Sequence, residues 1–187
     1  HINIVHMIQF YKPKPTVTGS ACSFYLNDSE NSFFASIIKQ KSWDKDRRRA
    51  SFEKDDPKKK VIVKFSRKEI CGIIDAIKRN VELSGYHGSN QIVKFKFGPY
   101  MRDDKQLGFS FMVHKESKED STDKASFAIG FDFPESVELT LFLESMVARS
   151  FDNERKARAK QKKMYEKEGY APKAAPANQP SQEAEIW

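Results

Sequence analysis

The feature that most constrains the fold is a change of hydrophobic period that occurs twice along the chain. Segments with an apolar residue at every second position, the pattern of half-buried strands, are followed by a segment with apolar residues three and four positions apart, the pattern of a helix. The helices are expected at residues 66–80 and from 134 to about 151. The strand segments within each half have hairpin-length connections, which are too short for parallel crossovers. The predicted class is therefore α+β, with two antiparallel β-sheets that are each followed by a helix.

Alternation defines the expected strands. They are residues 20–27, 31–40, 59–66, 91–100, 107–115 and 125–133, with a further short strand compatible with 50–53. The stretch at 84–90, SGYHGSN, is dense in turn formers and is predicted to close the first half. Phenylalanines at alternating positions are expected in the core, namely Phe95, Phe97, Phe109, Phe111, Phe127, Phe131 and Phe133.

Both helix starts carry recognisable signals. Ser66 with Glu69 three residues later forms the capping-box pattern, and isoleucines then recur at helical spacing. Pro134 suits the first position of the second helix, and Glu135 suits the positive end of the helix dipole.

Length and composition favour one domain with a tail. Residues 1–7 are interpreted as a cloning remnant with Met7 as a candidate native start, and 8–152 as the domain. Residues 153–168 are predicted to be a charged, frayed helical extension, and 169–187 a flexible Pro/Ala/Gln-rich tail that ends in an acidic and hydrophobic tip.

The charge balance indicates a polyanionic partner. The formal net charge is +7, which suits nucleic acid or an anionic membrane surface. No apolar run approaches the roughly 20 residues that span a bilayer, so no membrane association is expected. Cys22 and Cys71 lie inside apolar patterns and indicate neither a disulfide framework nor a zinc motif. The expected compartment is the reducing cytoplasm of a bacterium, with an organelle as the alternative.

Catalytic motifs are weak. The four histidines are scattered and no Gly-rich phosphate loop occurs, so no enzyme activity, metal or cofactor is predicted. The acidic pairs at 55–56 and 103–104 leave a magnesium-dependent nuclease as an alternative, although their lysine-flanked contexts favour solvated hairpin tips.

Lysine or arginine beside aromatic residues is instead the recurrent motif. Cations follow a nucleic-acid backbone, and each base can stack on a ring for roughly 1–3 kcal/mol. The predicted DNA-binding residues are Tyr11, Lys12, Lys14, Trp43, Arg47, Arg48, Lys64, Tyr86, His87, Lys94, Lys96 and Tyr100. For Trp43, Tyr86 and Tyr100, structural packing and surface function both remain open.

In this order the motifs resemble the Whirly family of single-stranded DNA-binding proteins. FYKPK at 10–14 is similar to the family's Phe-Tyr-Lys-Gly-Lys opening, and Trp-Asp at 43–44 followed by KKVIVKFSRKE is similar to its strand and helix start. GYHGS, QIVKFKFGPY and GFSFMVHK then follow in the family's order. The resemblance implies two packed four-stranded sheets, each followed by a helix, with pseudo-twofold symmetry, DNA along the sheet edges, and homo-tetramers or dimers. Pro13 departs from the family's glycine.

The function expected from the sequence is non-sequence-specific single-stranded DNA binding that protects DNA in replication, recombination or repair, in a phage or other virus or in a cell. The alternative is an RNA-binding or annealing module, or a transcription regulator, with a Whirly-like fold. A terminal tip is expected to recruit replication or repair proteins and to compete with DNA for the basic surface; its residues are Glu183, Glu185, Ile186 and Trp187.

Overall fold

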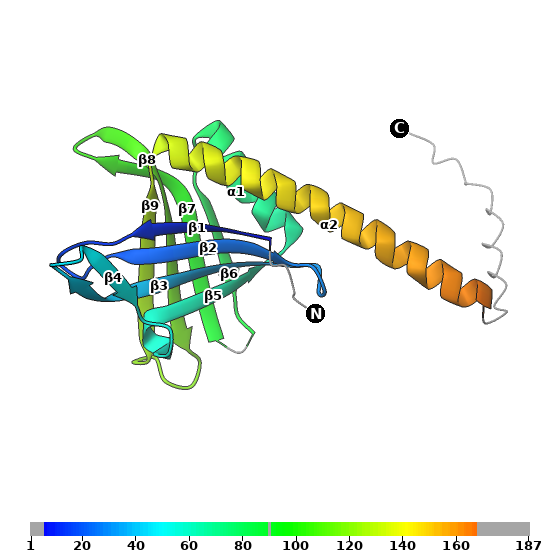
Figure 1. Ribbon diagram of the computed structural model, residues 1–187, viewed down its shortest axis with the longest axis horizontal. Helices are drawn as coiled ribbons and strands as arrows, with labels where there is room; N and C mark the ends of the chain where they lie inside the picture. Colours follow the sequence, from blue (N-terminus) through cyan, green and yellow to red (C-terminus); the bar gives the residue numbers. More distant parts are fainter. Residues whose placement is uncertain (1–5, 90, 168–187) are drawn as a thin grey trace, which may run out of the picture. The chain divides into compact units, whose positions relative to one another are not determined.

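The computed structural model describes residues 6–89 and 91–167 (Figure 1). Its first half contains five strands and then a helix. They are β1 (His6–Lys12), β2 (Ser20–Asn27), β3 (Ser32–Asp44), β4 (Arg49–Phe52) and β5 (Lys60–Phe65), followed by α1 (Arg67–Arg79), with a short 3₁₀ helix η1 (Pro57–Lys59) before β5.

The second half contains four strands and a long helix. They are β6 (Leu83–His87), β7 (Gln91–Arg102), β8 (Lys105–Ser117), β9 (Lys124–Phe131) and α2 (Phe133–Lys167). The chain separates into two compact units, His1–Asn153 and Glu154–Trp187. Both sheets and α1 belong to the first unit, and the described part of the second is the end of α2.

Every strand pairing in the two sheets is antiparallel. In the first sheet β1, β2 and β3 are neighbours, and β4 and β5 both pair with β3. In the second sheet the order is β6-β7-β8-β9. This confirms the α+β class with two antiparallel sheets.

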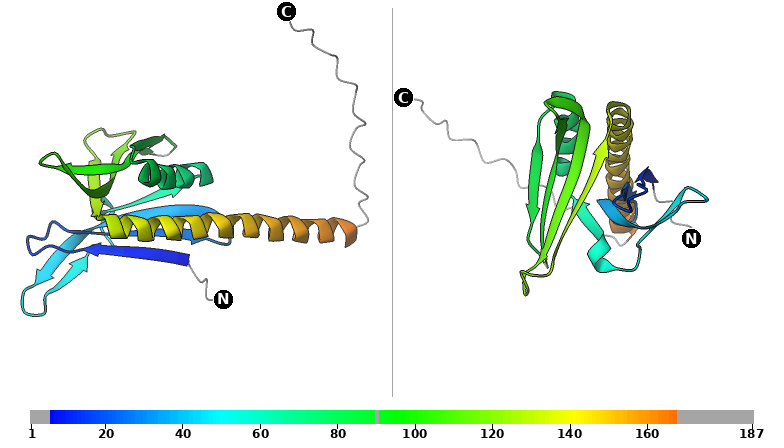
Figure 2. Two further views of the ribbon diagram at one scale, coloured as in Figure 1. Left: turned by 90° about the horizontal axis from the view of Figure 1, so that it is seen from above. Right: turned by 90° about the vertical axis from the view of Figure 1, so that its left-hand side faces the viewer.

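The hydrophobic core lies between the inner faces of the two sheets, which form separate layers (Figure 2). Aromatic rings bridge the layers: the centroids of Phe24 and Phe111 are 5.6 Å apart and those of Phe65 and Phe95 are 5.0 Å apart. Both helices add aliphatic side chains to this core, namely Ile70, Ile73, Leu139, Leu143 and Met146. The inner faces of the sheets are therefore used for packing, and the outer faces lie outside this core.

The predicted helix caps are present. The Ser66 hydroxyl accepts a hydrogen bond from the Glu69 amide and the Glu69 carboxylate accepts one from the Ser66 amide, which confirms the capping box. Asp132 and Glu135 exchange the same pair of bonds at the start of α2. The second helix runs on to Lys167, well past residue 151.

Three local expectations were wrong. The stretch at 84–90 is largely a strand, β6, because its backbone pairs with β7 along Leu83–His87 despite its turn-forming residues. Phe133 is not in the core, since it begins α2 and is 49% exposed. The first sheet has five strands rather than four. His6 and Met7, at the start of β1, pair with Leu26 and Tyr25.

The structure also describes the two cysteines, the acidic pair at 103–104 and the hydrophobicity of the helices. Cys22 and Cys71 are free thiols. Asp103 and Asp104 occupy the tip between β7 and β8 with positive φ values of 49° and 59°, the hairpin-tip geometry expected of them. No helix in the described ranges is long and apolar enough to cross a membrane.

Candidate nucleic-acid interface

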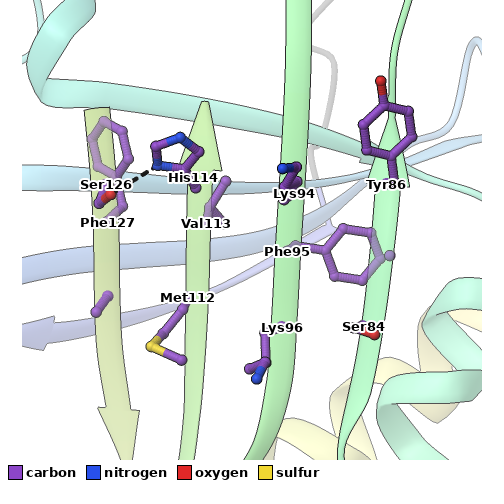
Figure 3. A pocket seen from close by; sticks show the side chains of 12 residues that line it. Ser84, Tyr86, Lys94, Phe95, Lys96, Met112, Val113, His114, Ser126 and Phe127 are labelled. Atoms are coloured by element: carbon purple, nitrogen blue, oxygen red, sulfur yellow. Dashed lines mark hydrogen bonds between the residues drawn. The ribbon is translucent and has the colours of Figure 1, made fainter. Parts of the chain in front are cut away.

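The outer face of the second sheet presents polar and aromatic side chains in register across its four strands. Tyr86 of β6, Lys94 of β7, His114 of β8 and Ser126 of β9 are successive cross-strand partners. Figure 3 shows them as one row, with the His114 ring bonded to the Ser126 hydroxyl (Nδ1–Oγ 3.0 Å). The row exists because strand alternation sends their neighbours, such as Phe95 and Val113, into the core.

A second row lies one repeat further along the same face. It consists of Ser84, Lys96, Met112 and Ala128. Together the two rows line a hollow of about 880 Å³. Tyr86 is 60% exposed at one side of this hollow, and Met112 is 41% exposed within it.

An adjoining hollow of about 540 Å³ extends this site toward the first sheet. It shares Met112 and Ala128 with the first hollow, so the two adjoin along β8 and β9. Its other lining residues include Tyr100 on β7, Lys12 at the end of β1 and Lys14 in the β1–β2 connection. We call the two adjoining hollows the groove.

The floor of the groove along β9 is made of small residues. Ser126, Ala128 and Gly130 alternate on the outer face of that strand. At Gly130 a Cβ atom would meet nothing nearer than the Phe109 carbonyl oxygen at 3.9 Å. A Cβ atom would therefore fit the fold there, and the glycine leaves the groove open.

The groove contains four lysines, Lys12, Lys14, Lys94 and Lys96. Two of them are paired with carboxylates: Lys96 Nζ lies 3.1 Å from Glu82 Oε1, and Lys12 forms an ion pair with Glu135. Among the described residues Lys94 has no carboxylate partner within ion-pair distance. Lys94 can therefore contact a phosphate of a nucleic-acid backbone directly. Lys12 and Lys96 can do so once the phosphate replaces the carboxylate with which each is paired.

The electrostatics of the groove include one histidine. Besides its bond to Ser126, His114 has its Nε2 3.7 Å from Glu116 Oε2. No group of three or more metal-binding side chains occurs within residues 6–89 and 91–167.

The structure brings together half of the predicted DNA-binding residues. Those that line the groove are Lys12, Lys14, Tyr86, Lys94, Lys96 and Tyr100. Tyr86 and Tyr100, for which packing and surface function were both open, are 60% and 43% exposed, so their side chains lie on the surface.

Two predicted residues lie on the outer face of the first sheet instead. Lys64 extends its ammonium over the ring of Phe34, 5.7 Å from the centroid. Tyr11 lies against Phe52, with centroids 5.8 Å apart. Neither lines the groove: Lys64 lies on the outer face of β5, and Tyr11 alternates away from its groove-lining neighbour Lys12 on β1.

Three more predicted residues belong to the β3–β4 hairpin. Trp43 is half-buried and pairs with Ala50 across the hairpin. Arg47 and Arg48 are exposed in its turn, and Arg47 lies 4.0 Å from Asp44. The hairpin is an extension of the first sheet and does not line the groove.

His87 has a packing role. Its Nε2 lies 2.7 Å from Glu69 Oε1, and its ring is 5.5 Å from that of Phe95. It pairs with Val93, so it alternates away from Tyr86 and contacts α1 instead of the groove. The pKa of Glu69 is lowered: burial raises it, but hydrogen bonds from the Ser66 amide and from His87 outweigh that effect.

The lining residues that sequence reasoning missed include Met112, His114, Ser126 and Ala128 of β8 and β9. Their signal was the alternation of β8 and β9 itself, which assigns each of them to the face opposite the buried phenylalanines. The predicted tip residues Glu183, Glu185, Ile186 and Trp187 lie outside the described residues.

Comparison with known proteins gives a likeness of fold. No family model matches the chain, and no curated protein matches it. Among solved structures, the crystal structures of MRP1/MRP2 from Trypanosoma brucei match with a TM-score of 0.53 and 14% sequence identity, over 78% of this chain and 93% of that chain. At this identity the match shows a shared fold alone.

Proposed function

We propose that this protein binds single-stranded DNA without sequence specificity and protects it in replication, recombination or repair. The observation that carries the proposal is the groove, where two exposed tyrosines and four lysines line two adjoining hollows. Rings supply a stacking surface for unpaired bases, and ammonium groups supply contacts for the phosphates.

The chemistry of the groove favours binding without base readout. Bidentate recognition of a base edge uses Asn or Gln for adenine and Arg or Lys for guanine. The residues that line the two hollows include no Arg, Asn or Gln, and their lysines also serve as contacts for phosphates. Lysine, tyrosine, serine and methionine contact a backbone or the face of any base, so every sequence is expected to bind with similar affinity.

We further propose a Whirly-like relationship, with the two halves related as a pseudo-twofold repeat. The order of strands, helix, strands and helix supports it, and so does the residue-level resemblance at 10–14 and 91–100. A phage or other viral origin is part of the same proposal.

A homo-oligomer is proposed through α2. Phe133, Val137 and Leu141 are 49%, 58% and 63% exposed, and their spacing of four residues places them along one side of the helix. Contiguous exposed apolar surface of this kind marks protein interaction sites. Light scattering of the full chain beside Leu141→Lys tests this, since a smaller mass for the variant is expected and equal masses would contradict it.

Fluorescence anisotropy with labelled oligo-dT, oligo-U and a matched duplex tests the function. Tight binding to oligo-dT and much weaker binding to duplex are expected, because paired bases do not offer their faces to Tyr86 and Tyr100. Equal or tighter binding to duplex would rule out the proposal. Preferential binding of oligo-U would instead favour the RNA-binding alternative.

A further inference from the structure

A single buried amide holds the connection between β1 and β2. Gln40 is 3% exposed. Its Oε1 accepts hydrogen bonds from the amides of Lys14 (2.8 Å) and Gly19 (3.1 Å). Its Nε2 donates to the carbonyls of Lys14 (3.0 Å) and Ser42 (3.1 Å). All four hydrogen-bonding positions of the side chain are therefore used.

Three of these four bonds end on the connection, residues 13–19. Both the amide and the carbonyl of Lys14 are bound, so the peptide groups on either side of its Cα are fixed. Lys14 also lies between Pro13 and Pro15, whose rings restrict the backbone further. Lys14 therefore lies on a connection without regular secondary structure, but its backbone is tied to a buried residue of β3.

The connection also contains a strained backbone conformation at Val17 and a close atomic approach at Gly19. Val17 has a φ of +61°, an unfavourable conformation for a β-branched residue, and its amide bonds the Lys14 carbonyl at 2.9 Å. A side chain at Gly19 would overlap Gln40 Oε1 and the Lys12 carbonyl. The glycine is required by the close approach of the amide, and the surrounding bonds hold the strained valine.

We propose that Gln40 is a positioning residue of the nucleic-acid site, which fixes Lys14 at the end of the groove where it meets a phosphate. This rests on the proposed function of the groove. Lys14 is exposed and lines the hollow, whereas Gln40 is buried and does not line it. Gln40 thus acts through Lys14. A cation whose backbone is already ordered loses less conformational entropy on binding than one on a mobile loop.

The test uses the full chain and Gln40→Met, which keeps the length of the side chain and removes its hydrogen bonds. Hydrogen exchange measured by NMR should show faster exchange at the Lys14 and Gly19 amides, which lose their acceptor. This readout needs no ligand. If Gln40→Met does not fold, Gln40→Asn keeps an amide group without adding a charge, but its side chain is one methylene shorter and cannot make all four bonds, and the same measurements are made on it.

Binding of oligo-dT over a range of salt then separates positioning from general support. Gln40→Met should lower the log–log salt slope by up to about 0.7, the value for one phosphate contact with a single strand. In a chain that already carries Lys14→Ala, Gln40→Met should cause no further decrease in the salt slope. In a chain that carries Lys94→Ala, Gln40→Met should cause the full decrease. Lys94 is the matched control, since it is a groove lysine with no bond to Gln40.

The outcomes are distinguishable. Two results would overturn the positioning role while the proposed function survives, provided that the wild-type chain binds oligo-dT. One is a salt slope that Gln40→Met leaves unchanged. The other is a slope that Gln40→Met lowers by the same amount in the Lys14→Ala and the Lys94→Ala backgrounds. If the wild-type chain prefers duplex, the proposed function itself fails. Faster amide exchange together with a slope loss that depends on Lys14 supports the proposal.

Discussion

Lys96 Nζ on β7 lies 3.1 Å from Glu82 Oε1, just before β6, so one cation of the groove is already paired with an anion of the same molecule. Both side chains are about half exposed. Exposed ion pairs of this type contribute about 0.2–1 kcal/mol. A phosphate that binds Lys96 must therefore overcome this attraction.

Replacing Glu82 with glutamine should strengthen binding of oligo-dT by up to about fivefold at low salt, the equivalent of about 1 kcal/mol. The gain should shrink as salt rises, because screening weakens the competing pair in the wild-type protein. Anisotropy titrations at two salt concentrations measure both effects.

The matched control is Glu144→Gln. Glu144 pairs with Lys78 and lines neither hollow of the groove, but its replacement changes the net charge by the same amount. An equal gain from the two variants would show that net charge, not release of Lys96, is responsible.

Lys94 and Lys96 stand on neighbouring rows of the groove. Replacing both with alanine should weaken binding and lower the log–log salt slope by up to about 0.7 for each lost phosphate contact. Lys64→Ala, on the outer face of the first sheet, should leave the slope unchanged. If Lys64→Ala lowers the salt slope as much as the loss of one groove lysine does, the DNA-binding site would instead include the outer face of the first sheet.

Tyr86 and Tyr11 form a natural pair for testing stacking, since they are 60% and 58% exposed on different sheets. Tyr86→Ala should cost roughly 1–3 kcal/mol of binding if its ring stacks on a base, with no change in salt slope. Tyr86→Phe should bind as the wild type does, and Tyr11→Ala should have no effect. Titrations with oligo-dT decide this, and equal losses at both tyrosines would contradict it.

Much of the fold could be predicted because it depends on local rules. Alternation placed the core phenylalanines of β7, β8 and β9 correctly, and Phe97 and Phe111 are fully buried. The cap formed by Ser66 and Glu69 also follows from spacing alone. Each of these signals lies within a few residues of the structure that it specifies.

The rest depends on pairing between distant segments. Gly85 and His87 indicate a turn by composition, and only the partner strand β7 makes them part of β6. The sequence grouped Lys12, Lys64 and Lys94 as DNA-binding residues, but it could not show which face of which sheet each belongs to. The buried role of Gln40 was equally invisible, since its partners on the β1–β2 connection are 21 and 26 residues away.

The open floor of the groove can be tested at Gly130. Gly130→Val should still fold, because a Cβ atom there meets nothing nearer than 3.9 Å and valine favours a strand. Its side chain should narrow the groove and weaken binding of oligo-dT several-fold, with Gly130→Ala intermediate. Thermal unfolding and titration are both needed. Unchanged binding by a folded Gly130→Val protein would show that the ligand does not approach β9.

Asp28, which follows β2, joins the turn before β3 to α2. Its carboxylate accepts hydrogen bonds from Arg149 Nε and Nη2, both at 2.7 Å, and from Asn153 Nδ2 at 2.8 Å. The hydrogen bond from Arg149, aided by that from Asn153, holds the pKa of Asp28 below its ordinary value of 3.8, although partial burial opposes this. Because the pKa of Asp28 is lower in the folded state than in the unfolded state, its charged carboxylate stabilises the fold fully at pH values above the unfolded-state pKa.

Asp28→Asn should therefore lower stability at pH 7 by up to about 1 kcal/mol, the range of a well-oriented surface pair. The difference from wild type should stay constant down to about pH 5 and then shrink as the pH falls through the unfolded pKa of 3.8 toward the lower folded one. Urea unfolding at pH 7 and pH 3 measures this. Asp75→Asn is the control, because Asp75 pairs with Arg79 inside α1 and joins no separate elements. A difference for Asp28→Asn that grows with acidity would have the wrong sign and would refute the role of the charged carboxylate.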